Sequence, residues 1–278
     1  MTELPELFRL QDRVALVTGG AGLLGTQFCR TLAAAGASVI VADIDARGAQ
    51  TVSDSLAQAG HATMAVHTDV TSADSVRQLV RTTQDTYGRL DILVNSAVLD
   101  PKFDPGHMSE ASVDEGLGAF ESYPLDAWDR ALQVNITGVF LCCQAAVRPM
   151  LDQGRGVIIN LSSIYGLAAP DQRMYQHPGK PAQYKPVYYP VTKSAVLGLT
   201  RYLATYYAGK NIRVNALSPG GVYNGHDDDF VEAYSARSVL GRMAEKDEMD
   251  GALLFLASDA SQYMTGGNLV VDGGWTAW

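Results

Sequence analysis

The amino-acid sequence predicts a protein of the α/β class, built on one doubly wound parallel sheet of seven strands. Two observations support this prediction. Short runs of β-branched residues alternate along the chain with longer stretches of helical periodicity, which is typical of a parallel sheet covered by crossover helices. No repeat or linker divides the 278 residues, a length sufficient to bury a substantial core. We therefore expect one domain over residues 1–278.

The expected strands are short apolar runs, and the expected helices are the longer periodic stretches between them. The strands are Arg13–Thr18, Ser38–Asp43, Thr63–Thr68, Ile92–Ser96, Gly156–Ser162, Ile212–Ser218 and Asn268–Asp272. The helices are expected near 22–35, 47–58, 71–87, 125–153, 187–207 and 245–258. Thr71 and Asp126 are the expected caps near the starts of the third and fourth helices.

Three segments interrupt the alternation, and all are rich in Gly, Pro, Asp and aromatic residues. They are Val98–Pro124, Ala168–Gln183 and Gly220–Ala244. Each would follow the carboxyl end of a strand, where open parallel sheets bind ligands. We expect them to form the walls of a substrate pocket. The alternative is that they are plain surface excursions.

Composition indicates a globular protein that does not bind nucleic acid. Hydrophobic residues make up 47% of the chain and charged residues 18%, and the net charge of -9 disfavours nucleic acid and anionic membranes as partners. No apolar run approaches the length of a bilayer span, and the first residues are too polar for a signal peptide, so we expect a cytoplasmic protein.

The cysteines and histidines do not predict a metal site or a disulfide. Cys29, Cys142 and Cys143 form no CxxC pair and are expected to be reduced packing residues. The five histidines are scattered along the chain without the spacing of a metal motif. We therefore expect no protein-built metal centre.

The turn after the first expected strand reads TGGAGLLG, from Thr18 to Gly25. Glycines at a strand-to-helix turn allow the backbone to approach a pyrophosphate, and the following helix start offers free N–H donors. No Gly-Lys-Ser/Thr follows, so this is not a P-loop. The turn predicts a dinucleotide site, with a tight turn that binds nothing as the alternative.

The ends of the next three expected strands also carry polar side chains. Asp43 ends the second strand, where a carboxylate can accept hydrogen bonds from an adenosine ribose and repel a 2′-phosphate; this favours NAD over NADP. Helix capping by Asp43 or Asp45 is the alternative. Asp69-Val70 and Asn95-Ser96-Ala97 end the third and fourth strands, beside the same site.

Two adjacent tyrosines precede a lysine in the stretch PVYYPVTK. Residues four apart share a helix face, so Tyr189 should lie over Lys193 while Tyr188 points about 100° away. A nearby ammonium would lower the pKa of the Tyr189 phenol and make it a usable acid or base near neutral pH. Tyr188 is expected to pack or to line the pocket. A surface Tyr/Lys pair without a role is the alternative.

With these residues in view, the chain resembles the short-chain dehydrogenase/reductase family along nearly its whole length. The matching pieces are Thr18–Gly25, Asp43, Asp69, NSA at 95–97, NITG at 135–138, NLSS at 160–163, YPVTK at 189–193, NALSPGG at 215–221 and TGGNLVVDGGW at 265–275. The resemblance implies one Rossmann-like domain and an NAD-dependent oxidoreductase with a four-residue proton relay. It also implies a homo-oligomer, a tetramer or a dimer, with the helices near 125–153 and 187–207 at its interfaces.

The resemblance implies a role for each relay residue. Tyr189 would exchange a proton with the substrate, and Lys193 would bind the nicotinamide ribose and tune Tyr189. Ser163 would orient the substrate oxygen. Asn135 would hold a helix kink and a water that joins Lys193 to solvent. Besides Tyr189 and Lys193, the expected NAD contacts are Gly19, Ala21, Gly22, Leu23, Leu24, Gly25, Asp43, Asp69, Val70, Asn95, Ala97, Gly220 and Val222.

The chain departs from the family pattern at several points. Leu23 occupies the middle glycine position of the usual TGxxxGxG, with Gly22 one step earlier, so the phosphate turn is expected to differ in detail. Asn224 stands where a threonine commonly contacts the nicotinamide amide. The segment Ala168–Gln183 is inserted between Ser163 and Tyr189 and should reshape the substrate entrance.

The expected substrate is polar and sugar-like: a sugar, sugar acid or polyol whose secondary alcohol exchanges a hydride with the nicotinamide. This expectation rests on the inserts and on a looser resemblance to family members of sugar and surface-polysaccharide metabolism. The polar residues expected at the pocket rim are Asp100, Lys102, Asp104, His107, Asp171, Gln172, Arg173, Gln176, His177, Lys180 and Asn224.

Three other functions stay open. One is a ketoreductase that acts on an acyl or hydrophobic carbonyl substrate, which the polar inserts disfavour. A nucleotide-sugar epimerase or dehydratase shares the glycine spacing and the Tyr/Lys pair, but little chain follows Ser218 to build a sugar-nucleotide domain. A non-catalytic NAD sensor could keep the glycine turn, yet it would not need the relay residues.

Overall fold

The computed structural model describes residues 4–100, 118–176 and 182–278, and it contains the seven-stranded parallel sheet that the sequence predicts. The strand order is β3-β2-β1-β4-β5-β6-β7. The bounds are β1 Val14–Thr18, β2 Ser38–Asp43, β3 Thr63–His67, β4 Ile92–Asn95, β5 Gly156–Leu161, β6 Ile212–Pro219 and β7 Asn268–Val271. Each lies within two residues of its predicted range.

The central strands read as continuous apolar runs because both of their faces are covered. Every residue of β1, β4 and β5 is buried. Parallel sheets acquire this property from crossover helices on both sides, which leave no solvent-facing row of side chains. The alternation of such runs with helical stretches was therefore a reliable signal for the fold, and the α/β prediction is confirmed.

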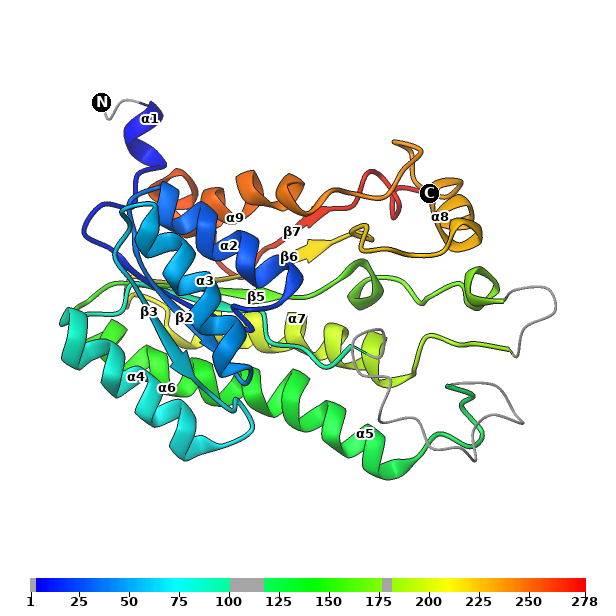
Figure 1. The fold of residues 1–278 in the computed structure, drawn as a ribbon, viewed down its shortest axis with the longest axis horizontal. Coiled ribbons are helices and arrows are strands. Elements are labelled where there is room, and N and C mark those ends of the chain that lie inside the picture. The colour runs from blue at the N-terminus through cyan, green and yellow to red at the C-terminus, as the bar shows by residue number, and fades with distance from the viewer. Residues whose placement is uncertain (1–3, 101–117, 177–181) are drawn as a thin grey trace.

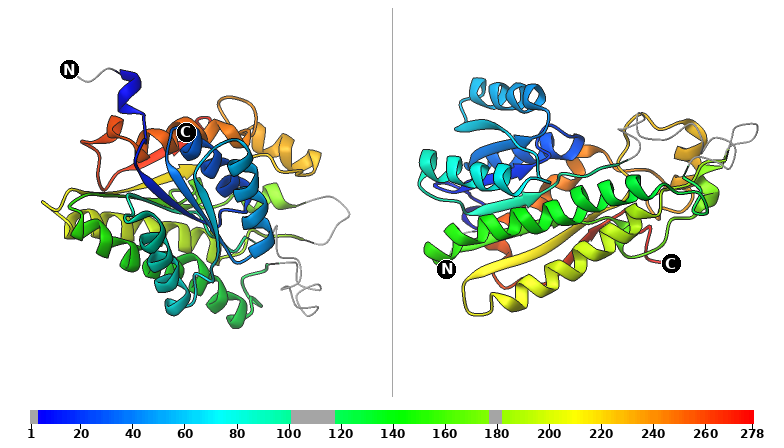
Figure 2. Two further views of the ribbon diagram at one scale, coloured as in Figure 1. Left: turned by 60° about the vertical axis from the view of Figure 1, so that its left-hand side comes forward. Right: turned by 90° about the horizontal axis from the view of Figure 1, so that it is seen from below.

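Helices cover both faces of the sheet (Figures 1 and 2). On one face, α2 (Leu23–Ala34), α3 (Ala46–Gln58) and α9 (Asp250–Ala257) pack on the apolar side chains of the strands. On the other face, the same packing is made by α4 (Ala73–Tyr87), α6 (Val139–Asp152) and α7 (Tyr188–Tyr206). The free cysteines Cys29, Cys142 and Cys143 are buried in these two layers, as expected.

The helix expected near 125–153 is continuous but not regular. It begins as α5 (Leu125–Leu132), passes through a π-helical turn at Gln133–Gly138, and continues as α6. By length and composition alone, Leu125–Asp152 could cross a membrane, but half of its most apolar window is buried inside the protein. Burial of that kind is typical of a core helix, which here packs on the sheet.

Several local predictions differ from the structure. The cap of α4 is Ser72, not Thr71, because the Thr71 hydroxyl instead donates to Asp69 at 2.7 Å. Pro124 is the capping residue of α5, and Asp126 lies in its first turn. Two further helices were not predicted: α1 (Leu4–Leu7) and α8 (Asp228–Ser235), which lies inside the segment 220–244.

The strand register brings the carboxyl ends of the strands to one edge of the sheet. Thr18 pairs with Asn95, and Asn95 pairs with Asn160 in β5. The sheet order reverses between β1 and β4, since the chain runs outward to β3 before it returns to β4. Such a reversal opens a crevice above the strand ends, which is the usual ligand site of open parallel sheets.

Candidate active site

A cavity of about 840 Å³ lies at the carboxyl edge of the sheet. Its walls come from the ends of six strands and from the segments that follow them. The residues that line it are Gly19, Ala21, Gly22, Leu23, Leu24, Gly25, Asp43, Ile44, Asp45, Thr68, Asp69, Val70, Ser96, Ala97, Val98, Leu99, Asp100, Arg130, Val134, Leu161, Ser162, Ser163, Ile164, Tyr165, Tyr175, Lys185, Tyr189, Lys193, Pro219, Gly220, Gly221, Val222, Asn224, His226, Phe230, Tyr234 and Met243.

The glycine-rich turn forms one end of the cavity and leaves no room for a side chain at Gly19 or Gly25. A Cβ on Gly25 would lie 1.9 Å from the carbonyl oxygen of Gly19. Gly19 itself has a φ of +65°, and a Cβ there would approach the backbone of Ala97 to 2.7 Å. At these two glycines the turn therefore packs its backbone directly on the segment after β4, at the reversal point of the sheet.

The turn leads into a helix start that is suited to an anion. The capping residue of α2 is Gly22, which has no side chain to accept the first N–H groups, and the first turn contains no acidic residue. Gly22, Leu23 and Leu24 all line the cavity. Free N–H groups and the positive end of the helix dipole favour a phosphate group at such a start. Leu23 occupies the first helical position, so its side chain adds an apolar surface there.

Two carboxylates lie beside this end of the cavity. Asp43 accepts hydrogen bonds from the backbone N–H groups of Ala21 and Asp45, both at 2.9 Å. Asp69 accepts from the N–H and the hydroxyl of Thr71. These bonds fix both carboxylates on the cavity wall. Capping of α3 is done by Asp45, so the capping alternative holds for Asp45 and does not explain Asp43.

The predicted contact at Asn95 is wrong for its side chain. The Asn95 amide donates to Asn160 at 2.8 Å and to the sulfur of Cys143, so it ties β4 to β5 behind the cavity. Among the described lining residues, Ser96 and Ala97 occupy that position instead. Asn95 ends its strand with a side chain on the buried face, whereas the two residues after it turn toward the crevice.

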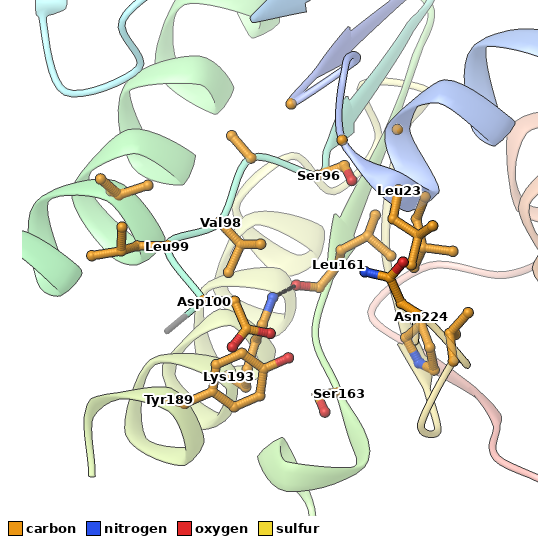
Figure 3. A pocket seen from close by; sticks show the side chains of 18 of the residues that line it. Leu23, Ser96, Val98, Leu99, Asp100, Leu161, Ser163, Tyr189, Lys193 and Asn224 are labelled. Carbon is orange, nitrogen blue, oxygen red and sulfur yellow. Dashed lines mark hydrogen bonds between the residues drawn. The ribbon is translucent and has the colours of Figure 1, made fainter. Parts of the chain in front are cut away.

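Three of the four predicted relay residues, Ser163, Tyr189 and Lys193, lie together at the other end of the cavity (Figure 3). Tyr189 and Lys193 lie one turn apart in α7, and both line the cavity. The Lys193 ammonium donates to the backbone carbonyl of Leu161 at 2.8 Å, which joins α7 to the end of β5. Tyr188 is buried and packs instead on Tyr123, with ring centres 6.1 Å apart.

The two serines after β5 differ in what they contact. The Ser162 hydroxyl donates to the backbone carbonyl of Lys193 at 2.8 Å and so fixes α7 on the sheet. The Ser163 hydroxyl lies near the Tyr189 phenol (Figure 3) and acts to lower its pKa. The Oγ of Ser163 also accepts from the N–H of Tyr165 at 3.2 Å. The second serine is therefore the one on the side of the relay tyrosine, and its predicted role in orienting the substrate oxygen stays a prediction.

Asn135 lies in the π-helical turn between α5 and α6, and it is 3% exposed. Its Oδ1 accepts from the N–H of Leu99 at 2.7 Å, and its amide donates to the Leu99 carbonyl and to the Thr192 hydroxyl, both at 3.3 Å. Asn135 thus connects the segment after β4 to α7. It does not line the cavity among the described residues, and its water link to Lys193 stays a prediction.

The pKa of Tyr189 is shifted in the direction opposite to the one expected from the sequence. Burial is the largest cause that raises the pKa of the Tyr189 phenol, and the Asp100 carboxylate raises it further; the Ser163 hydroxyl acts in the opposite direction. The expected lowering of this pKa by Lys193 is therefore wrong for the protein without ligands. Burial also lowers the pKa of Lys193 to about 8, with Asp100 raising it and Lys185 lowering it.

The substrate side of the cavity is more aromatic than the sequence indicated. Asp100 and Asn224 line it as predicted, but Asp171, Gln172, Arg173 and Gln176 do not. Asp171 instead pairs with Arg173 and Arg237. The other expected rim residues, at positions 102, 104, 107, 177 and 180, lie outside the described residues. Aromatic rings take their place in the wall: Tyr165, Tyr175, His226, Phe230 and Tyr234.

The chain is similar to proteins that are named reductases or dehydrogenases. A family model described as enoyl-(acyl carrier protein) reductase matches residues 20–276. The chain is 37% identical over 271 residues to cis-4-hydroxycyclohexanecarboxylate dehydrogenase of Sinomonas cyclohexanicum, covering 96% of this chain and 97% of that one. It is 39% identical over 269 residues to 3-alpha-(or 20-beta)-hydroxysteroid dehydrogenase of Mycobacterium tuberculosis, covering 97% and 91%.

A solved structure matches the whole fold. Gluconate 5-dehydrogenase from Burkholderia cenocepacia, in complex with NADP and tartrate, superposes with a TM-score of 0.85 at 30% sequence identity, covering 99% of this chain and 100% of that one. The sheet and the helices around the cavity are therefore shared with a protein that holds a nicotinamide cofactor.

Proposed function

The chain belongs to the short-chain dehydrogenase/reductase family and is an oxidoreductase, and we propose that it is an NAD-dependent dehydrogenase of secondary alcohols. The observation that carries the proposal is the meeting of Ser163, Tyr189 and Lys193 at one end of a cavity whose other end is the glycine turn. A protein that only sensed NAD would have no need of this second end.

The proposed chemistry divides between the cofactor and the chain. Bound NAD supplies the hydride acceptor, and the protein residues position the alcohol and move its proton. Tyr189 takes the hydroxyl proton during oxidation, and Ser163, which lines the same end of the cavity, orients the same oxygen. Lys193 holds a positive charge beside the phenol and is fixed by the Leu161 carbonyl. Asn135 keeps the neighbouring backbone of Leu99 in place.

The preference for NAD over NADP rests on Asp43. Its carboxylate lines the cavity beside the glycine turn and is held there by the N–H groups of Ala21 and Asp45. An anion fixed at this position can accept from the ribose hydroxyls of NAD and repels the 2′-phosphate of NADP. The related gluconate dehydrogenase structure contains NADP, so the cofactor preference of this chain has to be measured separately.

For the substrate we propose a small hydroxylated compound: a polyol, a sugar or a sugar acid. Lys185, Asp100 and Asn224 offer hydrogen-bonding groups near the relay, and the aromatic wall offers faces on which the C–H side of a ring can rest. The same wall supports a second candidate, a less polar cyclic alcohol or ketone. The names of the relatives span both classes, from gluconate 5-dehydrogenase to 3-alpha-(or 20-beta)-hydroxysteroid dehydrogenase.

We also propose a cytoplasmic homo-oligomer, a dimer or a tetramer, with α6 and α7 at its interfaces. Exposed apolar and aromatic side chains on these helices support this proposal, namely Phe140 at 46%, Tyr202 at 60% and Tyr206 at 64% exposure. Light scattering measures the mass directly. A monomer at micromolar concentration would contradict the proposal.

A substrate panel tests the function. Purified enzyme is assayed with NAD against polyols, sugars and sugar acids, and in parallel against cyclic alcohols of matched size, such as cyclohexanol and hydroxycyclohexanecarboxylates. We expect the highest kcat/KM in the hydroxylated group. A higher value for the cyclic alcohols would select the second candidate, and rapid turnover of an acyl thioester would contradict both.

A further inference from the structure

An ion pair between Lys185 and Asp100 lies against the ring of Tyr189. The Lys185 ammonium is 3.0 Å from Oδ1 of Asp100, and the two side chains are only 14% and 20% exposed. The same ammonium lies 4.1 Å from the centre of the Tyr189 ring, whereas the ammonium of Lys193 lies 5.7 Å away. The cation nearest to this ring, of these two, is therefore outside the YPVTK motif.

Both members of the pair are held by backbone contacts. The Gln172 side chain accepts from the N–H of Lys185 at 2.9 Å and donates to its carbonyl at 3.2 Å, so it clamps the chain just before α7. Asp100 follows Leu99, whose N–H and carbonyl are both bonded to Asn135. Gln172, in the segment 168–183, therefore helps to fix the Lys185 cation beside the relay.

The pair is one part of the charge environment of Tyr189. Asp100 comes from the segment after β4, and Lys185 from the segment before α7. Figure 3 shows Asp100 beside Tyr189 and Lys193. Among the described residues, the other titratable groups that face Tyr189 or line the same cavity are Lys193 of α7, Tyr165, Tyr175, Tyr234, Arg130 of α5, His226, Asp43, Asp45 and Asp69.

We propose that Lys185 and Asp100 form a charge-balancing pair for the proton relay, in which Lys185 offsets a carboxylate that would otherwise hold the proton on Tyr189. The proposal rests on the proposed function, because it adds a positioning pair to the same relay. Neither residue is required to touch the reacting carbon. The two charges set how readily Tyr189 releases and regains its proton.

The electrostatics of the site support opposite effects for the two charges. Asp100 raises the pKa of Tyr189 and the pKa of Lys193, while Lys185 lowers the pKa of Lys193. An ammonium above an aromatic face is attracted by the ring, and more strongly when the ring belongs to a phenolate. Because the pair is largely buried, salt screens it less than a surface pair. Removal of one partner should shift the local charge toward the sign of the partner that remains.

The first test reads the charge balance without cofactor or substrate. The chain has six lysines at positions 102, 180, 185, 193, 210 and 246, so the ¹³Cε signal of Lys193 can be followed by NMR in labelled protein and assigned with a Lys193→Met variant. Lys185→Met should raise the Lys193 pKa by about one unit, and Asp100→Asn should lower it by about as much. The double variant should return close to the wild type.

Matched controls separate charge from packing. Lys210→Met makes the same chemical change at an exposed site and should leave the Lys193 titration unchanged. Lys185→Arg keeps the charge and should stay near the wild-type value. If Lys185→Met does not give the wild-type circular dichroism spectrum, Lys185→Gln replaces it. Shifts of one sign in both single variants, or no shift in either, would overturn the proposal.

The second test reads the relay during turnover. On the best substrate of the panel, the pH at which kcat for oxidation rises should move up by about one unit in Lys185→Met and down by about one unit in Asp100→Asn. Superimposable profiles would contradict the proposal. If the Lys193 pKa shifts as expected but no alcohol is oxidised, the proposed dehydrogenase function is wrong and the charge-balancing pair is still supported. If alcohols are oxidised normally but the Lys193 pKa does not shift, only the charge-balancing pair is wrong.

Discussion

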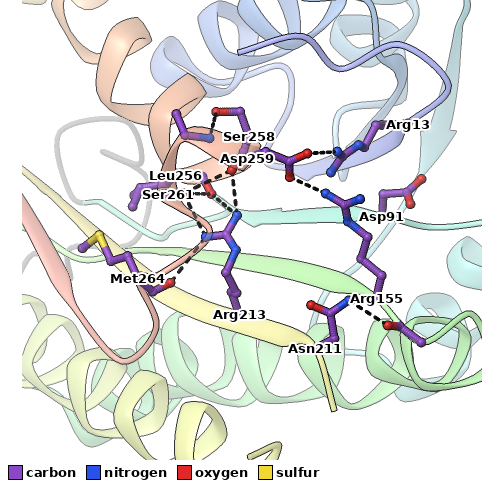
Figure 4. A network of polar contacts seen from close by, with 12 residues as sticks. Arg13, Asp91, Arg155, Asn211, Arg213, Leu256, Ser258, Asp259, Ser261 and Met264 are labelled. Carbon is purple, nitrogen blue, oxygen red and sulfur yellow. Dashed lines mark hydrogen bonds and ion pairs between the residues drawn. The ribbon is translucent and has the colours of Figure 1, made fainter. Parts of the chain in front are cut away.

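The two edges of the same sheet carry polar groups that do different work. At the carboxyl edge, Asp43, Ser163, Tyr189 and Lys193 face a cavity of about 840 Å³. At the amino edge, Arg213 and Asp259 form hydrogen bonds with other groups of the protein (Figure 4). Arg213 donates to the Ser261 hydroxyl and to the carbonyls of Leu256, Ser258 and Met264.

Asp259 completes the network at the amino edge. It accepts from Arg13, just before β1, and from Arg155, just before β5, so one carboxylate ties two strand starts to the turn after α9. Its hydrogen-bonding capacity is used for holding elements together. At the carboxyl edge, part of the hydrogen-bonding capacity is instead directed into the cavity. Burial of Tyr189 and Lys193 there disfavours their charged forms. Satisfied groups stabilise a fold, whereas groups with remaining capacity can bind and react.

The sharpest test of this contrast removes one oxygen from the carboxyl edge. Tyr189→Phe should lower kcat by about 10³-fold, within the range for losing a general acid or base, while NADH still binds. Tyr188→Phe is the matched control, because Tyr188 is buried against Tyr123 and lies off the cavity wall among the described residues. Steady-state kinetics and NADH fluorescence measure the two effects. Equal, mild losses of kcat would mean that Tyr189 is not the proton-exchanging group.

A change at the amino edge should act on stability and spare the chemistry. Arg213→Met removes the hydrogen bonds to the Ser261 hydroxyl and to the carbonyls of Leu256, Ser258 and Met264, so we expect a loss of about 3 kcal/mol in the free energy of unfolding. The kcat of the folded enzyme should change less than twofold. Urea unfolding measures the loss, with exposed Arg201→Met as the control. A large drop in kcat without a loss of stability would mean that the two edges are coupled.

The cofactor preference tests the fixed carboxylate at the carboxyl edge. We expect kcat/KM for NAD to exceed that for NADP by at least tenfold, about 1.4 kcal/mol, because Asp43 repels a 2′-phosphate. Asp43→Asn should narrow the ratio, while Asp54→Asn, at an exposed position of α3, should not. A tenfold preference for NADP in the wild type would overturn the role of Asp43.

The sequence predicted the parts of the molecule that local pattern determines. Continuous apolar runs identified β1, β4 and β5 because those strands are buried on both faces. The helix α8 was missed although its signals are present: Asp227 accepts from the N–H of Phe230 as its cap, and Val231 and Tyr234 follow with helical spacing. The acidic residues and glycines around it suggested a loop instead.

The missed parts of the site depend on contacts between distant residues. Lys185 stands beside Tyr189 because Gln172 clamps its backbone and Asp100 pairs with it across 85 positions of the chain. No local pattern encodes such a meeting. The predicted direction of the Tyr189 pKa shift was wrong for the same reason. The shift depends on burial by segments whose packing the sequence alone does not reveal.

The smallest effect that we expect concerns the stability cost of the relay lysine. Burial lowers the pKa of Lys193 from 10.5 to about 8 in the folded protein. Below about pH 8 both states are protonated, and the wild type bears the full cost of burying the ammonium. Between the two values the unfolded chain binds a proton that the folded chain does not, so wild-type stability rises with pH in this window relative to a variant that lacks the group.

Lys193→Met should therefore be more stable than the wild type at neutral pH and lose that advantage as the pH rises. The net gain at about pH 7 should be on the order of 1 kcal/mol, because relief of the buried charge is partly offset by the loss of the bond to the Leu161 carbonyl. Urea unfolding across the window measures the difference, with exposed Lys210→Met as the control. An advantage that stays constant up to about pH 10.5 would show that Lys193 is not strained by burial, and the contrast between the two edges would then rest on geometry alone.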